Sequence, residues 1–248
     1  MEHITTDGIV LKRTFVGEKD AIVKILTSEN GLILASVKGI KNMKSKLSAG
    51  ASVFSLSEFL LKEDRGRFIV ASASQKEGFY GLSSNIERLS FAAYFADLVC
   101  AYTPSAEDGK TLIPLILNTF YLLSNTSKNL SLIKCVFELK LLSALGYAPD
   151  LDTCISCGEP DGLCFFSHDE GGVLCRNCAV GSNVSIITKD TLSAMRYVSH
   201  TDLKKAFSFT LSESGLDEFN RCTEKMHRSI LATELSSLAY LKQITGKK

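Results

Sequence analysis

The sequence of 248 residues predicts an α+β protein, in which a small N-terminal β-barrel precedes an all-helical region that a four-cysteine module interrupts. Short apolar runs separated by turn residues fill residues 7–80, and helical periodicity begins near residue 83. Two Cys-x2-Cys pairs lie between residues 154 and 178. We therefore expect a barrel domain over 1–80, a helical domain in two parts over 81–150 and 186–248, and the cysteine module over 151–185.

Five runs in the barrel segment are rich in Val, Ile, Leu and Phe and alternate in part with polar residues, as half-buried strands do. These runs are Asp7–Phe15, Lys19–Ser28, Gly31–Gly39, Ser52–Lys62 and Gly66–Lys76. Asn30-Gly31 between the second and third runs is a strong signal for a tight hairpin. Five strands in about 75 residues suit a closed barrel, which leaves no exposed sheet edge.

The character of the chain changes to helical at Ser84-Asn85-Ile86-Glu87, which matches a capping box. One apolar helical face is expected to follow it, made of Ile86, Leu89, Ala93, Ala96 and Cys100. A second helix is expected over about residues 110–123. A third carries Leu132, Val136, Leu139 and Leu142 on its apolar face and ends at Gly146.

Helical periodicity returns after the cysteine module, over Thr188–His200 and then Glu213–Ile244. The module is therefore expected to be an insertion within one helical domain. No run of the sequence approaches the ~20 apolar residues of a membrane span. We expect a soluble, cytoplasmic protein.

The four cysteines of the module are Cys154, Cys157, Cys175 and Cys178, in the pattern C-x2-C-x17-C-x2-C. At this spacing two pairs of thiolates can converge on one zinc ion. Four thiolates leave no open position for a reactive water, so the predicted zinc is structural. Disulfides would need an oxidising compartment, but the N-terminal residues lack the features of a signal peptide. A redox-active Cys-x2-Cys would not need the second pair.

A zinc deaminase is the enzymatic alternative, because His168-Asp169-Glu170 precedes the second cysteine pair. Leu174, instead of proline, precedes that pair, and the first pair would have no role. The other cysteines are Cys100, Cys135, Cys164 and Cys222, and we expect them to be reduced core residues. The sequence has no Gly-rich phosphate loop and no Ser/His/Asp pattern, so it does not favour catalysis.

Charge is distributed unevenly along a chain whose net charge is only +1. Residues 151–185 hold 1 basic and 5 acidic residues, whereas residues 1–80 hold 12 basic and 9 acidic residues. An acidic zinc module is a poor candidate for reading nucleic acid, because phosphate contacts depend on cationic side chains. We therefore expect the zinc to hold the module together.

The connection between the third and fourth predicted strands is basic, and no acidic residue occurs between Asn30 and Ser57. Its lysines are Lys38, Lys41, Lys44 and Lys46, and Lys12 and Arg13 on the first strand are expected to extend the same surface. Such a surface suits the phosphate backbone of DNA. The alternative is a solvated loop whose charge serves solubility. Phe15, Phe54, Phe59 and Phe68 lie in the barrel, where phenylalanine is more often a core residue than a stacking platform, so none is assigned to DNA.

Several stretches carry a resemblance to a known family. They are Gly8-Ile9-Val10-Leu11 leading to Gly17-Glu18-Lys19-Asp20, Thr27-Ser28-Glu29-Asn30-Gly31-Leu32, Glu138-Leu139-Lys140-Leu141-Leu142, Leu145-Gly146-Tyr147-Ala148-Pro149, and Phe165-Phe166-Ser167 before Gly171-Gly172-Val173-Leu174-Cys175. Together with the basic loop and the cysteine pairs, these stretches cover nearly the whole chain and occur in the same order as the motifs of that family. In these features the sequence resembles the RecO family of bacterial recombination mediators.

The resemblance implies an N-terminal OB-fold, a helical domain and one structural Zn²⁺. It also implies a non-enzymatic protein that binds single- and double-stranded DNA, anneals complementary strands, and acts with RecR to replace single-strand-binding protein with RecA. Such a protein would be bacterial and cytoplasmic, and associated with the nucleoid when active. The C-terminal stretch from Glu234 to Leu241 departs from the family because it has few basic residues. The alternative function is a zinc-stapled scaffold for protein interactions, with incidental DNA contact.

Overall fold

The computed structural model describes residues 2–42, 45–64, 66–179 and 183–246. The chain forms two compact units. The first combines Met1–Thr126 with Leu235–Lys248, and the second is Ser127–Glu234. The helices that were expected to form one domain are thus divided between the units, while the division of the chain into four functional segments stays a prediction.

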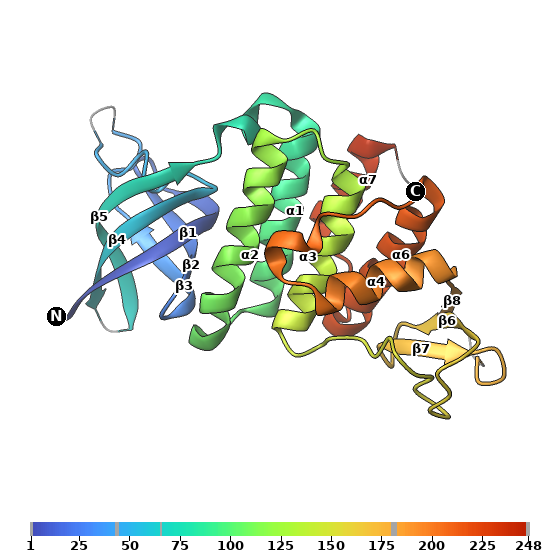
Figure 1. Cartoon of the computed structure of the whole chain (residues 1–248). Helices are drawn as coiled ribbons and strands as arrows, with labels where there is room; N and C mark the ends of the chain where they lie inside the picture. The colour runs from blue at the N-terminus through green and yellow to red at the C-terminus, as the bar shows by residue number, and fades with distance from the viewer. Residues whose placement is uncertain (1, 43–44, 65, 180–182, 247–248) are drawn as a thin grey trace. The chain divides into compact units, whose positions relative to one another are not determined.

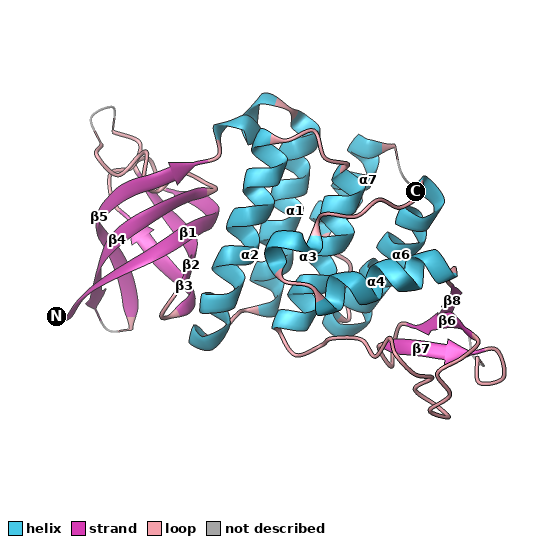
Figure 2. Ribbon diagram, in the orientation of Figure 1, coloured by secondary structure: helices cyan, strands magenta, loops and turns pink. Residues whose placement is uncertain are grey.

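Five strands open the first unit and close into a barrel with the order β1-β2-β3-β5-β4 (Figures 1 and 2). They are β1 (Glu2–Val16), β2 (Asp20–Thr27), β3 (Gly31–Val37), β4 (Ser55–Asp64) and β5 (Arg67–Gly78). Strand β1 pairs with both β2 and β4, and β3 pairs with β5 in parallel, which closes the barrel. The predicted five-stranded OB-fold is confirmed.

Alternation along the strands fills the barrel. In β2 and β3 the buried residues Val23, Ile25, Ile33 and Ala35 point inward, while Leu34 is exposed on the outer wall. Phe59 of β4 is fully buried and belongs to the same core cluster. The register is thus set by which residues of each strand face the core.

Three helices belong to the same unit as the barrel, together with a short 3-10 helix, Tyr80–Ser84. They are α1 (Ile86–Tyr102), α2 (Ala106–Asn125) and α7 (Ser236–Thr245). Helix α1 packs against α2, α7 and β1, so it is buried on several sides. This differs from the single apolar face expected from the sequence, because Ile86 is exposed while Phe91, Tyr94 and Phe95 are buried.

The start of α1 also differs from the expected capping box. The N-cap residue is Asn85, whose side-chain oxygen accepts hydrogen bonds from the backbone N–H groups of Glu87 and Arg88. Ser84 instead donates from its hydroxyl to the carbonyl of Gly81, within the preceding turn. Asn and Ser are both good N-caps, and the local turn decides between them.

The hairpin between β2 and β3 lies against the start of α2. Gly31 has φ of +62°, and a Cβ atom there would overlap the backbone oxygens of Pro104 and Ser105. The Leu32 N–H donates to the Pro104 carbonyl at 3.0 Å. Glycine is therefore required at this turn both by conformation and by the close approach of the helix.

The second unit contains helices α3 (Leu130–Ala144), α4 (Lys189–His200), α5 (Leu203–Ala206) and α6 (Glu213–Leu231) and a small sheet of β6 (Leu163–Ser167), β7 (Gly172–Cys175) and β8 (Val184–Ile186). The sheet order is β7-β6-β8 (Figure 2). The stretch Glu213–Ile244, where helical periodicity was expected, forms two helices, because Ala232 adopts φ of +52° and ends α6 there. The remainder of that stretch forms α7.

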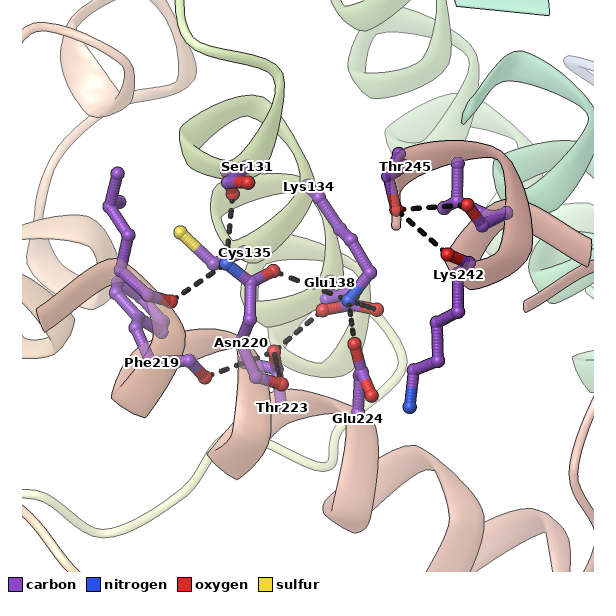
Figure 3. A network of polar contacts seen from close by, with 12 residues as sticks. Ser131, Lys134, Cys135, Glu138, Phe219, Asn220, Thr223, Glu224, Lys242 and Thr245 are labelled. Atoms are coloured by element: carbon purple, nitrogen blue, oxygen red, sulfur yellow. Dashed lines mark hydrogen bonds and ion pairs between the residues drawn. The ribbon is translucent and has the colours of Figure 1, made fainter. Parts of the chain in front are cut away.

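A buried polar network joins α3 to α6 (Figure 3). Lys134 Nζ lies 2.7 Å from Glu138 Oε1 and 2.8 Å from Glu224 Oε1. The Thr223 hydroxyl donates to the other oxygen of Glu138 at 2.6 Å. Burial by itself lowers the pKa of Lys134, but the two carboxylates outweigh burial and raise the pKa, so we treat this lysine as charged. No helix in the described part of the chain is long and apolar enough to cross a membrane.

Candidate metal centre and nucleic-acid interface

The four cysteines of the module lie on two tight turns. Cys154 and Cys157 are on the first, where the Gly158 N–H donates to the Cys154 carbonyl at 2.8 Å and Gly158 has φ of +76°. Cys175 ends β7, and the second turn follows at once, with the Cys178 N–H donating to the Cys175 carbonyl at 3.1 Å. The Ile155 N–H bonds to the Val173 carbonyl, which holds the first turn beside β7.

The four sulfur atoms converge, all lying within 4.8 Å of one another. Cys157 Sγ and Cys175 Sγ are 3.9 Å apart. A tetrahedron of thiolates with zinc–sulfur bonds of about 2.3 Å has an edge of about 3.8 Å, so the cluster has the size of a zinc site. Cys154 and Cys175 are buried, whereas Cys157 is exposed and Cys178 is partly exposed. The residues therefore fit a closed structural site at the edge of the module.

Within the cluster, Cys154 has a lowered thiol pKa and Cys178 a raised one. Burial raises the pKa of Cys154, but backbone N–H groups, led by that of Cys175, outweigh burial and lower the pKa to about 6. The pKa of Cys178 is raised to about 12, chiefly through its hydrogen bond with Cys157. Four like charges at this separation repel one another, so a dication is needed to hold all four sulfurs as thiolates at neutral pH.

His168 does not join the cysteine cluster. Its Nε2 lies 2.9 Å from the Ser185 hydroxyl, and its side chain is buried. Burial and the positive charge of Lys225 lower the pKa of His168 to about 4, so the ring is neutral at pH 7. The histidine, acid and cysteine arrangement of a zinc deaminase is therefore not formed. Cys100, Cys135 and Cys222 are buried, and burial raises the pKa of each thiol, as expected for inert core cysteines. Cys164 is only partly buried, which differs from the expectation for that residue.

The predicted basic connection begins directly after β3. Lys38 Nζ lies 3.0 Å from Asp20 Oδ2, and the Gly39 N–H donates to Asp20 Oδ1 at 2.8 Å. The Gly39 hydrogen bond and the Lys38 ammonium hold the pKa of the Asp20 carboxyl below its usual value. Asp20 therefore fixes the start of this connection and partly neutralises Lys38.

Lys12 and Arg13 lie on opposite faces of β1, because side chains alternate along a strand. Lys12 Nζ forms an ion pair of 2.6 Å with Asp97 of α1. Arg13 Cζ instead lies 5.0 Å from the centroid of the Phe15 ring, and Lys41 Nζ lies 4.4 Å from the same centroid. The structure thus brings Arg13 together with the basic connection and places Lys12 apart from both.

Two further lysines complete the predicted DNA-binding set. Lys46 is exposed near the end of the connection. Lys44 lies outside the described residues. Contact of the six cationic residues with DNA stays a prediction.

Phe15 is the residue of this surface that sequence reasoning left unassigned. Its side chain is 48% exposed, whereas Phe59 is fully buried and Phe68 packs against the barrel core. Phe54 makes an edge-to-face contact with Phe120 of α2, at 5.1 Å between centroids. The available signal was the position of Phe15 two residues after Arg13, at the end of a strand beside the Gly17 turn.

Comparison with protein families covers both parts of the chain. Residues 1–79 match the family model "Recombination protein O N terminal", and residues 83–239 match "Recombination protein O C terminal". The boundary between the two matches falls where the barrel gives way to the first helices.

Curated relatives agree over nearly full length. The chain is 34% identical to the DNA repair protein RecO of Acetivibrio thermocellus over 247 residues, which is 98% of each chain. It is 35% identical to the protein of the same name from Alkaliphilus metalliredigens over 82% of this chain and 83% of that one. A third, from Caldicellulosiruptor bescii, is 28% identical over 98% of this chain and 100% of the relative. On these matches, the chain belongs to the RecO family of DNA repair proteins.

Proposed function

We propose that this protein is a non-enzymatic DNA-binding and strand-annealing factor of recombinational repair. In this proposal it acts with RecR to load RecA onto single-stranded DNA that single-strand-binding protein covers. The observation that carries the proposal is the family match across both the OB-fold barrel and the helical region. The exposed cations of the barrel support it, because a surface that neutralises two phosphate backbones allows complementary strands to meet and base pairing supplies the free energy.

DNA binding is tested by fluorescence anisotropy of a labelled single-stranded oligonucleotide, titrated with protein at several salt concentrations. We expect log Kd to rise linearly with log[salt], with a slope of about 0.7 for each phosphate contacted. The test variant replaces four lysines with glutamine, namely Lys38, Lys41, Lys44 and Lys46. A matched control replaces four exposed lysines outside the barrel, namely Lys110, Lys189, Lys204 and Lys205.

The barrel variant should bind more weakly and with a smaller salt slope, while the control variant binds like the parent. Because Asp20 already pairs with Lys38, most of the loss should come from the other three lysines. If both variants weaken equally, the barrel is not the principal DNA surface. Salt-independent binding would contradict the electrostatic mechanism.

One structural Zn²⁺ is part of this proposal, held by Cys154, Cys157, Cys175 and Cys178. The spacing of the sulfurs supports it, and so does the need for a cation to hold four thiolates together. The ion would tie the first turn of the module to the end of β7 and take no part in chemistry. Metal analysis of the purified protein should give one equivalent of zinc.

The partner proteins are tested by order of addition. On single-stranded DNA covered with single-strand-binding protein, RecA by itself should assemble slowly. Its assembly should be faster when this protein and RecR are both present. If RecA assembles equally fast without this protein and RecR, the proposed mediator role is wrong. Normal partner docking by a protein that binds no DNA would favour the zinc-stapled scaffold, which the acidic character of residues 151–185 also suits.

A further inference from the structure

The end of the barrel at which β1 finishes carries an exposed aromatic ring, that of Phe15, with two cations close to it. Phe15 is the exposed aromatic residue in the described part of the barrel, since the other phenylalanines there pack into the core or against α2. Other apolar side chains of the barrel, such as Leu34, are exposed as well. Phe15 differs from them because it offers an aromatic face and has Arg13 and Lys41 within 5.0 Å of its centroid.

The two cations are positioned by the backbone around them. Arg13 Nη1 donates to the Ala51 carbonyl at 3.4 Å, which holds the guanidinium near the ring. The Lys41 N–H donates to the Lys19 carbonyl at 3.2 Å, which ties the basic connection to the β1–β2 turn. Neither side chain has an ion-pair partner among the residues that the structure describes.

The contacts on the ring are of a kind that a ligand can replace. A cation over an exposed aromatic face stabilises less than a nucleic-acid base stacked on an aromatic side chain. Lys41, on its flexible stem, gains a stronger partner when it moves from the ring to a phosphate. The exchange uncovers the part of the ring that Lys41 occupied, so a base can stack there while Lys41 contacts a phosphate.

We propose that Phe15 is a stacking platform for a base of single-stranded DNA, and that Arg13 and Lys41 contact the phosphates beside that base. This inference rests on the proposed DNA binding and adds a preference for single strands to it. In a duplex the base faces are already stacked on their neighbours, so the ring has nothing to receive. Because every base offers a π-face, the platform is indifferent to sequence.

The test uses the whole chain and three variants at position 15. Phe15→Ala removes the ring, and Phe15→Leu keeps apolar bulk without an aromatic face. The control is Leu34→Ala, because Leu34 is 58% exposed on the outer wall of the same barrel. Phe15→Trp adds a reporter, since the chain contains no tryptophan and its fluorescence would come from this site alone.

Phe15→Ala and Phe15→Leu should weaken binding to a single-stranded oligonucleotide by about 5- to 150-fold, the range that one stacked base supplies. Their salt slope should not change, whereas Lys41→Gln should reduce the slope by about 0.7. Leu34→Ala should bind like the parent. The single tryptophan of Phe15→Trp should be quenched by single-stranded DNA and unaffected by a duplex.

An abasic oligonucleotide separates stacking from charge. The parent and Phe15→Ala should bind it equally, because the phosphates remain and the bases are gone. Parental affinity of Phe15→Leu for single strands, together with an unquenched Phe15→Trp, would overturn the platform while leaving DNA binding intact. A parent protein that binds no DNA at low salt would overturn the proposed function, and the platform with it.

Discussion

The buried lysine of the α3–α6 network offers the sharpest test of how the second unit is held together. Lys134 is 4% exposed and Glu138 is fully buried, with 2.7 Å between the ammonium and the carboxylate. The substitution Lys134→Met keeps most of the apolar stem and removes the ammonium group, with its charge and the hydrogen bonds that it donates to Asn220 and Glu224. It leaves the Glu138 carboxylate in the interior without the cation that faces it.

The magnitude follows from the geometry. With an effective dielectric constant near 20, two unit charges 2.7 Å apart attract by about 6 kcal/mol, and the desolvation of both groups cancels part of this. Breaking one side of such a buried pair costs about 3–5 kcal/mol, because the remaining charge stays buried and uncompensated. For a chain of this size we expect Tm to fall by about 10 °C.

The assay is urea unfolding followed by far-ultraviolet circular dichroism, with thermal unfolding as a second measurement. Lys110→Met is the matched control, because Lys110 is exposed on α2, and it should change the free energy of unfolding by less than about 0.5 kcal/mol. The double variant Lys134→Met/Glu138→Leu removes both charges and should recover most of the loss. Glu224 is partly exposed, so it can turn toward solvent in that variant.

The pH dependence gives an independent check. Burial raises the pKa of Glu138, and in Lys134→Met no cation at position 134 opposes this effect. The folded variant then binds a proton more readily than its unfolded chain, so its stability should rise as pH falls through the raised pKa. A loss below 1 kcal/mol in Lys134→Met, or a double variant no more stable than the single one, would refute this account of the network.

Three further predictions concern other parts of the chain. Cys157→Ser should lose the zinc equivalent and the thermal stability of residues 151–185, and zinc chelation should make the parent resemble it; a variant that keeps both would disprove the four-thiolate site. His168 has a pKa of about 4 when folded, below its ordinary 6.5, because burial and then Lys225 disfavour the charged ring, so the unfolded chain protonates first as pH falls. Stability should decline by about 3 kcal/mol between pH 6.5 and 4, and His168→Gln should flatten that decline in urea titrations. Gly31→Ala should lower the free energy of unfolding by more than about 2 kcal/mol. Gly17 has a similar positive φ of +60° but open space around it, so Gly17→Ala should lower the free energy of unfolding by only about 1 kcal/mol. Equal losses in the two variants would mean that the contact with the start of α2 is unimportant.

Local patterns predicted the elements of this protein better than their ends. The barrel strands, the Asn30-Gly31 hairpin and most helix positions follow from the sequence, because alternation, turn residues and helical periodicity act over short distances. The N-cap of α1 moved from Ser84 to Asn85, and the last helix divided at Ala232. Both helix ends depend on capping and turn contacts, which periodicity alone does not locate.

The candidate sites divide in the same way. The cysteine pairs predicted a metal cluster because the coordination geometry of zinc constrains their spacing directly. Composition predicted that the connection after β3 is basic, but it could not predict which cationic side chains lie close together in the structure. Lys12 pairs with Asp97, 85 positions along the chain, while Arg13 beside it reaches Phe15 and Lys41.

The sequence by itself determined the class of fold, the four cysteines that form the cluster and the family of the protein, since each depends on patterns that short stretches of sequence carry. Only the tertiary structure decided which side chains remain outside the core. Phe15 and Phe59 are the same residue type on strands of one barrel, yet one is half exposed and the other fully buried. The exposure of a side chain depends on what distant segments place over it, and no local pattern contains that information.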